Sequence, residues 1–179
     1  PLAQTFTVDQ DGGFLTGVDL YFYKKDSGNN PLTVEIRTVE LGTPTTTVVG
    51  NSVTLRPDQI QTSDDASIAT KAIFDYPIYL SPGLEYALVL LAPESIEYEV
   101  FIAEMGKKTI QSQNLPDSES VVYTQQFAMG SLFKFQNGSV WTADQYQDMK
   151  FTLYRANFVT NTPSTAYFYN PTLNESNGY

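Results

Sequence analysis

Acidic side chains are the residues of this chain best suited to chemistry, and one pair has the spacing of a calcium loop. Asp9 and Asp11 alternate along the chain and are followed by Gly12 and Gly13. Calcium-binding loops of the EF-hand type also need an acidic ligand at the twelfth position, which is Leu20 here. We therefore expect a plain hairpin turn and no cofactor, with Asp9 and Asp11 as the candidate ligands if calcium binds.

Glutamates cluster around one predicted strand, where Glu97 and Glu99 share a face. A glycosidase needs two carboxylates roughly 5–9.5 Å apart across a substrate cleft. Neighbours two residues apart on a strand meet that distance by accident, so the pair favours a solvated strand face. Asp64 and Asp65 follow Ser63 ahead of another strand and are typical of a solvated turn.

Histidine and cysteine are both absent from the 179 residues. Histidine is the usual general base near neutral pH and the commonest metal ligand, so its absence excludes a Ser-His-Asp triad and a His-ligated zinc site. The absence of cysteine excludes disulfides, thiolate metal sites and a cysteine nucleophile. We therefore expect no catalytic residues and a protein that is not an enzyme.

Charge and hydropathy exclude two kinds of partner. The 10 basic and 20 acidic residues give a net charge of −10, which repels phosphate backbones, and no basic stripe suggests nucleic-acid binding. The longest apolar run, residues 87–92, is far short of the ~20 residues that a membrane helix needs. We expect neither a nucleic acid nor a membrane as partner.

Apolar residues alternate with polar ones nearly throughout the chain, which is the pattern of strands. Short strands at regular spacing with Gly/Pro turns predict an all-β fold, a two-sheet antiparallel β-sandwich of the jelly-roll-like kind, without helices of more than about two turns. The residues expected to face the core are Phe14, Val18, Leu20, Phe22, Val34, Ile36, Phe74, Tyr86, Leu88, Leu90, Val100 and Ile102.

Turn residues divide the chain into segments. Residues 24–31 are predicted to form a hairpin loop, 107–120 a long loop, and 137–139 a sharp turn. The predicted domain organisation is a β-sandwich module over residues 1–158, followed by a linker or the start of another domain over residues 159–179. The chain opens on Pro1 and closes on linker-like sequence, so we expect it to be one module of a longer protein.

Aromatic residues at outward positions are the candidates for binding. Exposed tyrosines supply rigid contact area for a protein or a sugar, and tryptophan is a frequent hot-spot residue. Trp141 follows the predicted turn and is either a surface contact or a plug for the open end of the core. The candidate interaction residues are Trp141, Asp144, Tyr146, Tyr21 and Tyr23.

Three segments together resemble a module of the large tail and baseplate structural proteins of contractile-tailed bacteriophages, especially those of marine cyanobacteria. They are residues 1–6 with 14–22, residues 34–37 with Gly42 and Pro44, and residues 130–134 with 136–145 and 151–156. The likeness spans about residues 1–158. It implies a jelly-roll-like sandwich in the virion that contacts other virion proteins or flanking domains of its own chain, with no catalytic residues to carry over.

The first half of the chain also resembles sandwich modules appended to bacterial surface proteins, some of which bind carbohydrate. The alternative is therefore a carbohydrate-binding or adhesive module of a larger extracellular or cell-surface protein, with a glycan as partner. Such a site needs aromatic faces grouped with amide or carboxylate side chains in a shallow groove, whereas an assembly surface is flatter and broader.

Overall fold

The computed structural model confirms the all-β class. It describes residues 1–125, 130–136, 140–163, 165 and 167. Two single-turn 3₁₀ helices, η1 (Pro57–Gln59) and η2 (Ile110–Ser112), are the helical elements of these residues. The strands are β1 (Leu2–Thr7), β2 (Gly13–Leu20), β3 (Phe22–Lys24), β4 (Leu32–Glu40), β5 (Thr43–Val48), β6 (Val53–Leu55), β7 (Thr70–Leu80), β8 (Glu85–Leu91), β9 (Glu99–Val100), β10 (Ile102–Glu104), β11 (Leu132–Gln136), β12 (Val140–Asp144), β13 (Gln147–Met149) and β14 (Phe151–Arg155).

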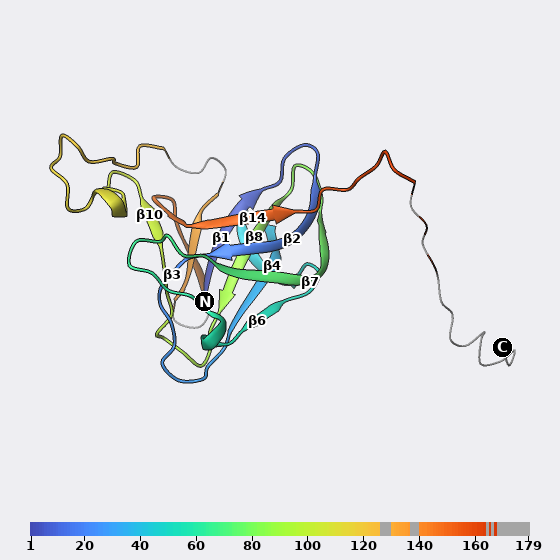
Figure 1. Ribbon diagram of the computed structural model, residues 1–179, viewed down its shortest axis with the longest axis horizontal. Helices are drawn as coiled ribbons and strands as arrows, with labels where there is room; N and C mark the ends of the chain where they lie inside the picture. The colour runs from blue at the N-terminus through green and yellow to red at the C-terminus, as the bar shows by residue number, and fades with distance from the viewer. Residues whose placement is uncertain (126–129, 137–139, 164, 166, 168–179) are drawn as a thin grey trace, which may run out of the picture.

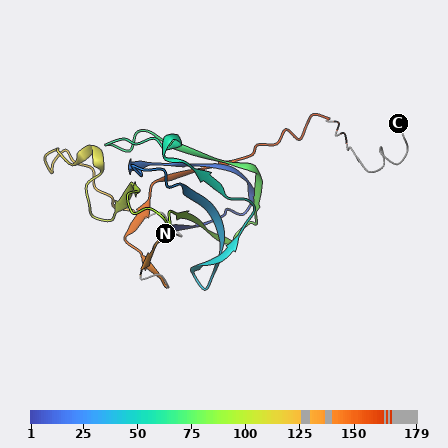
Figure 2. The ribbon, with the colours of Figure 1, turned by 90° about the horizontal axis from the view of Figure 1, so that it is seen from below.

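Two antiparallel sheets form the body of the molecule (Figure 1). In the described part of the chain the larger sheet has seven strands in the order β12-β11-β1-β8-β4-β5, with β6 also paired to β4, and it curls around one side of the core (Figure 2). The smaller sheet has the order β14-β2-β7. Both are antiparallel throughout, as predicted. The jelly-roll-like sandwich itself stays a prediction.

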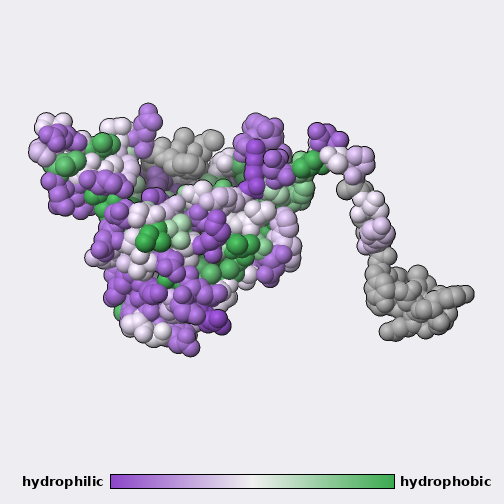
Figure 3. All heavy atoms as spheres, viewed as in Figure 1, coloured by the Kyte–Doolittle hydropathy of each residue, from purple (hydrophilic) through white to green (hydrophobic). Residues whose placement is uncertain are grey.

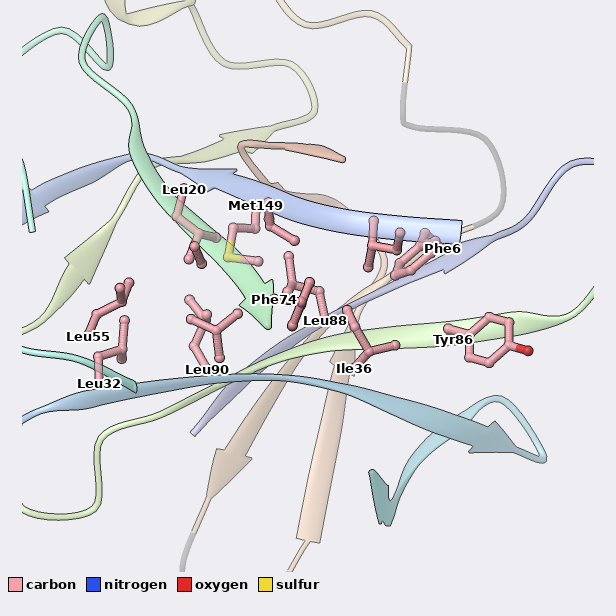
Figure 4. Packing of buried hydrophobic residues seen from close by; sticks show 14 of the residues in the cluster. Phe6, Leu20, Leu32, Ile36, Leu55, Phe74, Tyr86, Leu88, Leu90 and Met149 are labelled. Carbon is pink, nitrogen blue, oxygen red and sulfur yellow. The ribbon is translucent and has the colours of Figure 1, made fainter. Parts of the chain in front are cut away.

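One apolar core lies between the two sheets. Side chains of β2 and β7 meet those of β4 and β8 in Figure 4, with Phe6 of β1 at one end. Period-2 alternation identified most of this core from the sequence. The predicted inward residues that are buried are Val18, Leu20, Phe22, Val34, Ile36, Phe74, Tyr86, Leu88 and Leu90. Val100 is partly buried and packs against the same core.

Phe14 was expected in the core and is instead exposed on the outer face of the smaller sheet. The pairing of β2 with both its neighbours shifts register at Thr16, between Leu15 and Gly17. A bulge of this kind reverses which residues point inward, because side chains alternate with a period of two. Leu15 therefore takes the buried position that alternation from Val18 assigned to Phe14.

Ile102 was also expected inside and is exposed, because the chain leaves the core at Phe101. Before this residue β9 pairs with β3, and after it β10 pairs with β13. The backbone of Phe101 joins both regions: its N–H donates to the carbonyl of Tyr21 at 3.0 Å, and its carbonyl accepts from the N–H of Lys150 at 2.9 Å.

Residues 105–125 form a lobe beside the body, coloured yellow in Figure 1. The long loop predicted over residues 107–120 lies within it. The lobe closes on itself, since the N–H of Thr109 donates to the carbonyl of Val121 at 2.8 Å and that of Tyr123 donates to the carbonyl of Lys107 at 3.0 Å. The buried Ser112 hydroxyl accepts from the N–H of Val121 at 2.9 Å.

Two predicted hairpins are turns of another kind. The turn at residues 9–13 exists, with the N–H of Gly12 donating to the carbonyl of Asp9 at 3.2 Å. It joins β1 of the larger sheet to β2 of the smaller one, so it is not a hairpin. The loop at residues 24–31 likewise joins β3 and β4, which pair with other strands. Both hairpin predictions are therefore wrong, although the turns are where the sequence placed them.

Asp26 organises the loop between β3 and β4. Its buried carboxylate accepts hydrogen bonds from the Ser95 hydroxyl at 2.6 Å, from the N–H of Gly28 at 2.9 Å and from the N–H of Asn30 at 3.1 Å. The bond from Ser95, followed by those from Asn30 and Gly28, lowers the pKa of Asp26 below its ordinary value, although burial opposes this.

We expect Asp26→Asn to destabilise the protein near neutral pH and much less in acid. A lowered pKa in the folded state means that the ionised carboxylate stabilises the protein above the ordinary pKa of 3.8 and that this contribution is lost as the pH falls through the folded-state value. Thermal unfolding of both proteins between pH 3 and pH 7 measures it. Asp11→Asn, at an exposed position, is the control. A difference that stayed constant or grew in acid would contradict this role.

Candidate functional site

The outer face of the smaller sheet exposes a group of large apolar side chains. Side chains of β2, β7 and β14 that point away from the core lie here, together with one residue beyond β14. We define the outer face by its large apolar residues, all between 39% and 63% exposed: Phe14, Ile73, Tyr79, Tyr154 and Phe158. In Figure 3 hydrophobic atoms reach the surface over β7 and where the chain leaves β14, while tyrosines are pale in this colouring.

Strand pairing brings these residues together in rows. Gly17 pairs with Tyr154 on one side and with Ile73 on the other, so both side chains lie on the same face. The next row pairs Phe14 with Tyr79, whose ring centroids are 5.1 Å apart. Phe158 stacks edge-on against Phe14 at 5.3 Å. The bulge in β2 points Phe14 away from the core. It thereby places the Phe14 ring next to those of Tyr79 and Phe158.

Lys71 and Asp19, two charged residues beside the outer face, are paired with each other. Tyr154 donates its hydroxyl proton to Asp19 Oδ2 at 2.7 Å, and Lys71 Nζ lies 3.5 Å from Asp19 Oδ1 and 4.2 Å from the centroid of the Tyr154 ring. The hydrogen bond to Asp19, together with burial and the negative charge of that carboxylate, raises the pKa of Tyr154. These contacts fix the position of the Tyr154 ring on the outer face.

Trp141 lies on the opposite side of the molecule from the outer face, on the far face of the larger sheet. Its half-buried ring meets those of Phe135 and Phe133 edge-on, with centroids 5.1 and 6.5 Å away, and packs against a small second cluster of Ala3, Ala87, Val89 and Phe133. β11 and β12 pair antiparallel, as expected for two strands joined by the sharp turn predicted at residues 137–139. That turn itself lies outside the described residues.

Asp144 and Tyr146 do not join Trp141. Trp141 and Asp144 are three positions apart on β12, so their side chains point to opposite faces of the sheet. On its own face, Asp144 Oδ2 lies 3.3 Å from Lys134 Nζ. The same ammonium donates to Gln147 Oε1 at 2.6 Å, while Tyr146 is exposed in the turn that follows and its N–H donates to Asp144 Oδ1. The structure thus separates the proposed contact residues into a half-buried ring on one face and a polar turn on the other.

Tyr21 and Tyr23 lie beside the 105–125 lobe. Tyr21 is half-buried, with Lys150 Nζ 4.3 Å from its ring centroid. Tyr23 is 52% exposed, and its ring meets Phe101 edge-on at 6.0 Å. Tyr23 also lines a hollow between the body and the lobe. No periodic pattern points to this hollow, because much of its wall comes from the loop.

The carboxylates considered for catalysis are not brought together as a pair. Glu97 accepts from both the N–H and the hydroxyl of Ser27, at 2.8 and 3.1 Å, and so fixes the loop after β3. Glu99 instead lines the hollow. The two side chains that shared a face in the sequence pattern therefore have different surroundings.

Asp9 and Asp11, the calcium candidates, are both exposed. Asp9 Oδ2 lies 3.6 Å from Arg155 Nη1. Across the described ranges, no three acidic side chains gather closely enough to hold a metal ion. In the same residues, no helix has the length and apolar character needed to cross a membrane.

We expect EDTA to leave the melting temperature within a degree or two of its value in calcium-containing buffer. A site occupied at a hundred times its dissociation constant would add ~2.7 kcal/mol to the free energy of unfolding, which a thermal melt detects easily. Asp9→Asn with Asp11→Asn should melt alike in both buffers. A fall of many degrees in EDTA that this double variant abolishes would establish a calcium site in the turn.

Comparisons with known proteins add no relative: no family model, no curated protein and no solved structure matches this chain.

Proposed function

We propose that this chain is a non-catalytic structural module of a phage tail or baseplate protein, which acts by protein–protein contacts in the virion. The observation that carries the proposal is the outer face, where four large apolar side chains of one sheet and Phe158, just beyond β14, are 39–63% exposed. Large apolar side chains grouped on an exposed face are typical of sites of association. The tail or baseplate context rests on the resemblance of three sequence segments.

The composition of the outer face suits a protein partner. Protein interfaces are enriched in aromatic residues at their centre and carry a polar rim. Here Phe14, Tyr79 and Phe158 supply the aromatic centre, and Arg155 with Asp9 supplies part of the rim. Because Lys71 is already paired with Asp19, a partner need not supply a charge for either of these two residues.

The net charge of −10 further restricts the class of partner that can bind. A nucleic acid or an anionic membrane would be repelled at long range. An apolar patch within an acidic surface instead fits the complementary surface of a neighbouring subunit or domain.

Changing the outer face should block assembly without unfolding the module. In the tail or baseplate protein that carries this chain, Ile73→Asp with Tyr79→Asp should abolish incorporation into particles, because two carboxylates would be buried unpaired at the contact. Both positions are exposed, so the melting temperature of the module should change little. Incorporation is measured by quantitative mass spectrometry of purified particles.

Leu41→Asp is the matched control, since Leu41 is a fully exposed apolar residue in the turn between β4 and β5, on the other sheet. It should be incorporated like the unchanged protein. Normal incorporation of a folded Ile73→Asp/Tyr79→Asp variant would contradict the proposal.

A further inference from the structure

A hollow of about 600 Å³ separates the 105–125 lobe from strands β9, β10 and β13. Its apolar lining includes Phe101, Ile102 and Met149. Two tyrosines line the hollow: Tyr23 comes from β3, and Tyr123 comes from the lobe. The hollow thus has the size and the mixed lining of a small-molecule site.

Three charged groups of the lining are already hydrogen-bonded. Lys150 Nζ donates to the carbonyl of Ala66 at 2.8 Å, and Lys108 Nζ donates to the carbonyl of Leu115 at 2.9 Å. Glu104 Oε2 accepts from the Gln147 side chain at 3.0 Å. These three groups therefore serve the contacts of the lining itself.

Other polar groups of the lining have no partner among the described residues. These are the side chains of Glu99, Lys107 and Gln113 and the hydroxyls of Tyr23 and Tyr123. Together they offer hydrogen-bond donors and acceptors in the same small space as aromatic rings. A sugar ring needs this combination, because each hydroxyl both donates and accepts while the C–H faces of the ring pack on aromatic side chains.

The charges around the hollow select for a neutral ligand. The lining contains the ammonium groups of Lys107, Lys108 and Lys150 and the carboxylates of Glu99, Glu104 and Asp148, so its formal charge is balanced. This balance is local, in a chain with a net charge of −10. A phosphorylated or uronic-acid ligand would meet no surplus of positive charge here and would be repelled at long range.

We propose that this hollow is a binding site for a neutral oligosaccharide. Tyr23 and Tyr123 pack against the sugar rings, while Glu99, Lys107 and Gln113 bond their hydroxyls. The site is separate from the outer face, so a virion module could contact its neighbours with one surface and a glycan with the other.

The test is a titration of the intact chain with neutral hexasaccharides of glucose, mannose and galactose, followed by heteronuclear NMR. At least one of them should shift amide signals of Phe101, Gln113 and Tyr123 selectively. Tyr23→Ala should weaken its binding about tenfold, which corresponds to ~1.4 kcal/mol of lost contact. Gln113→Ala, a second exposed position, should weaken binding too, and both variants should keep their melting temperatures.

Tyr146→Ala is the matched control, because Tyr146 is an exposed tyrosine outside the hollow. The Ile73→Asp/Tyr79→Asp variant should bind the same sugar unchanged, which separates this inference from the proposed function. The inference would be overturned by no binding of any neutral hexasaccharide at millimolar concentration, or by unchanged binding in both Tyr23→Ala and Gln113→Ala. Selective binding of hexagalacturonate or of a tyrosine-containing hexapeptide in place of the neutral sugars would overturn it equally.

Discussion

Phe22→Ala is expected to lower the free energy of unfolding by about 3–5 kcal/mol. Phe22 is among the largest fully buried side chains, and its ring meets Tyr98 edge-on at 6.3 Å. Truncation would leave a cavity where β3 joins the main core, since the surrounding strands can close it only in part. Urea-induced unfolding followed by circular dichroism measures the change.

Tyr23→Ala provides the matched control for this substitution. Tyr23 is the next residue of the same strand and is 52% exposed, so its truncation should change the free energy of unfolding by no more than about 0.5 kcal/mol. Similar losses for both variants would mean that the alternation of buried and exposed residues at β3 is not as described.

Gln4→Met is expected to lower the free energy of unfolding by about 1–3 kcal/mol for each buried polar group that it leaves without a hydrogen bond. Gln4 is fully buried in β1, where its amide donates to Asp148 Oδ1 at 2.9 Å and accepts from the N–H of Met149 at 2.9 Å. Methionine keeps most of the volume and removes the hydrogen-bonding groups. The loss should appear in urea unfolding, and the β13 amide of Met149 should exchange faster with solvent.

Gln10→Met, at an exposed turn position, is the control and should be nearly neutral. An unchanged stability of Gln4→Met would show that the two bonds to β13 contribute nothing net. Unchanged exchange at Met149 would separately contradict the link between β1 and β13.

The alternation of apolar residues was sufficient to predict the all-β class and most of the core. Val18, Leu20 and Phe22 follow it because β2 and β3 are regular over those positions. Phe14 does not, because a single register shift at Thr16 reverses the faces. The sign of this shift in the sequence is Gly17, since a glycine inside a strand often marks a bulge. Phe14, which was predicted in the core, instead lies on the outer face between Tyr79 and Phe158.

The turn residues predicted the positions at which the chain reverses. They did not predict which sheet the next strand joins. The turn after Asp9 has the composition of a hairpin, yet β1 and β2 belong to different sheets. Local sequence fixes the turn, whereas the partner of the next strand depends on which apolar faces meet in the core.

The candidate site was predictable only in part. The grouping of Trp141 with Asp144 could have been rejected from the sequence, because positions three apart on a strand point to opposite faces. The hollow could not have been found, since Gln113 and Tyr123 come from a loop without periodicity. Tyr23 was identified as a contact residue, and its place at the hollow gives that prediction a specific test.

We propose that another protein covers the outer face in the assembled virion. Hydroxyl-radical footprinting of purified virions and of the isolated chain, analysed by mass spectrometry, tests it most directly. Phe14, Tyr79 and Phe158, all exposed in the isolated chain, should be labelled there and strongly protected in virions. Leu41 and Tyr146 should be labelled in both. Equal labelling of the outer face in the two samples, or the absence of peptides of this chain from purified virions, would contradict this proposal.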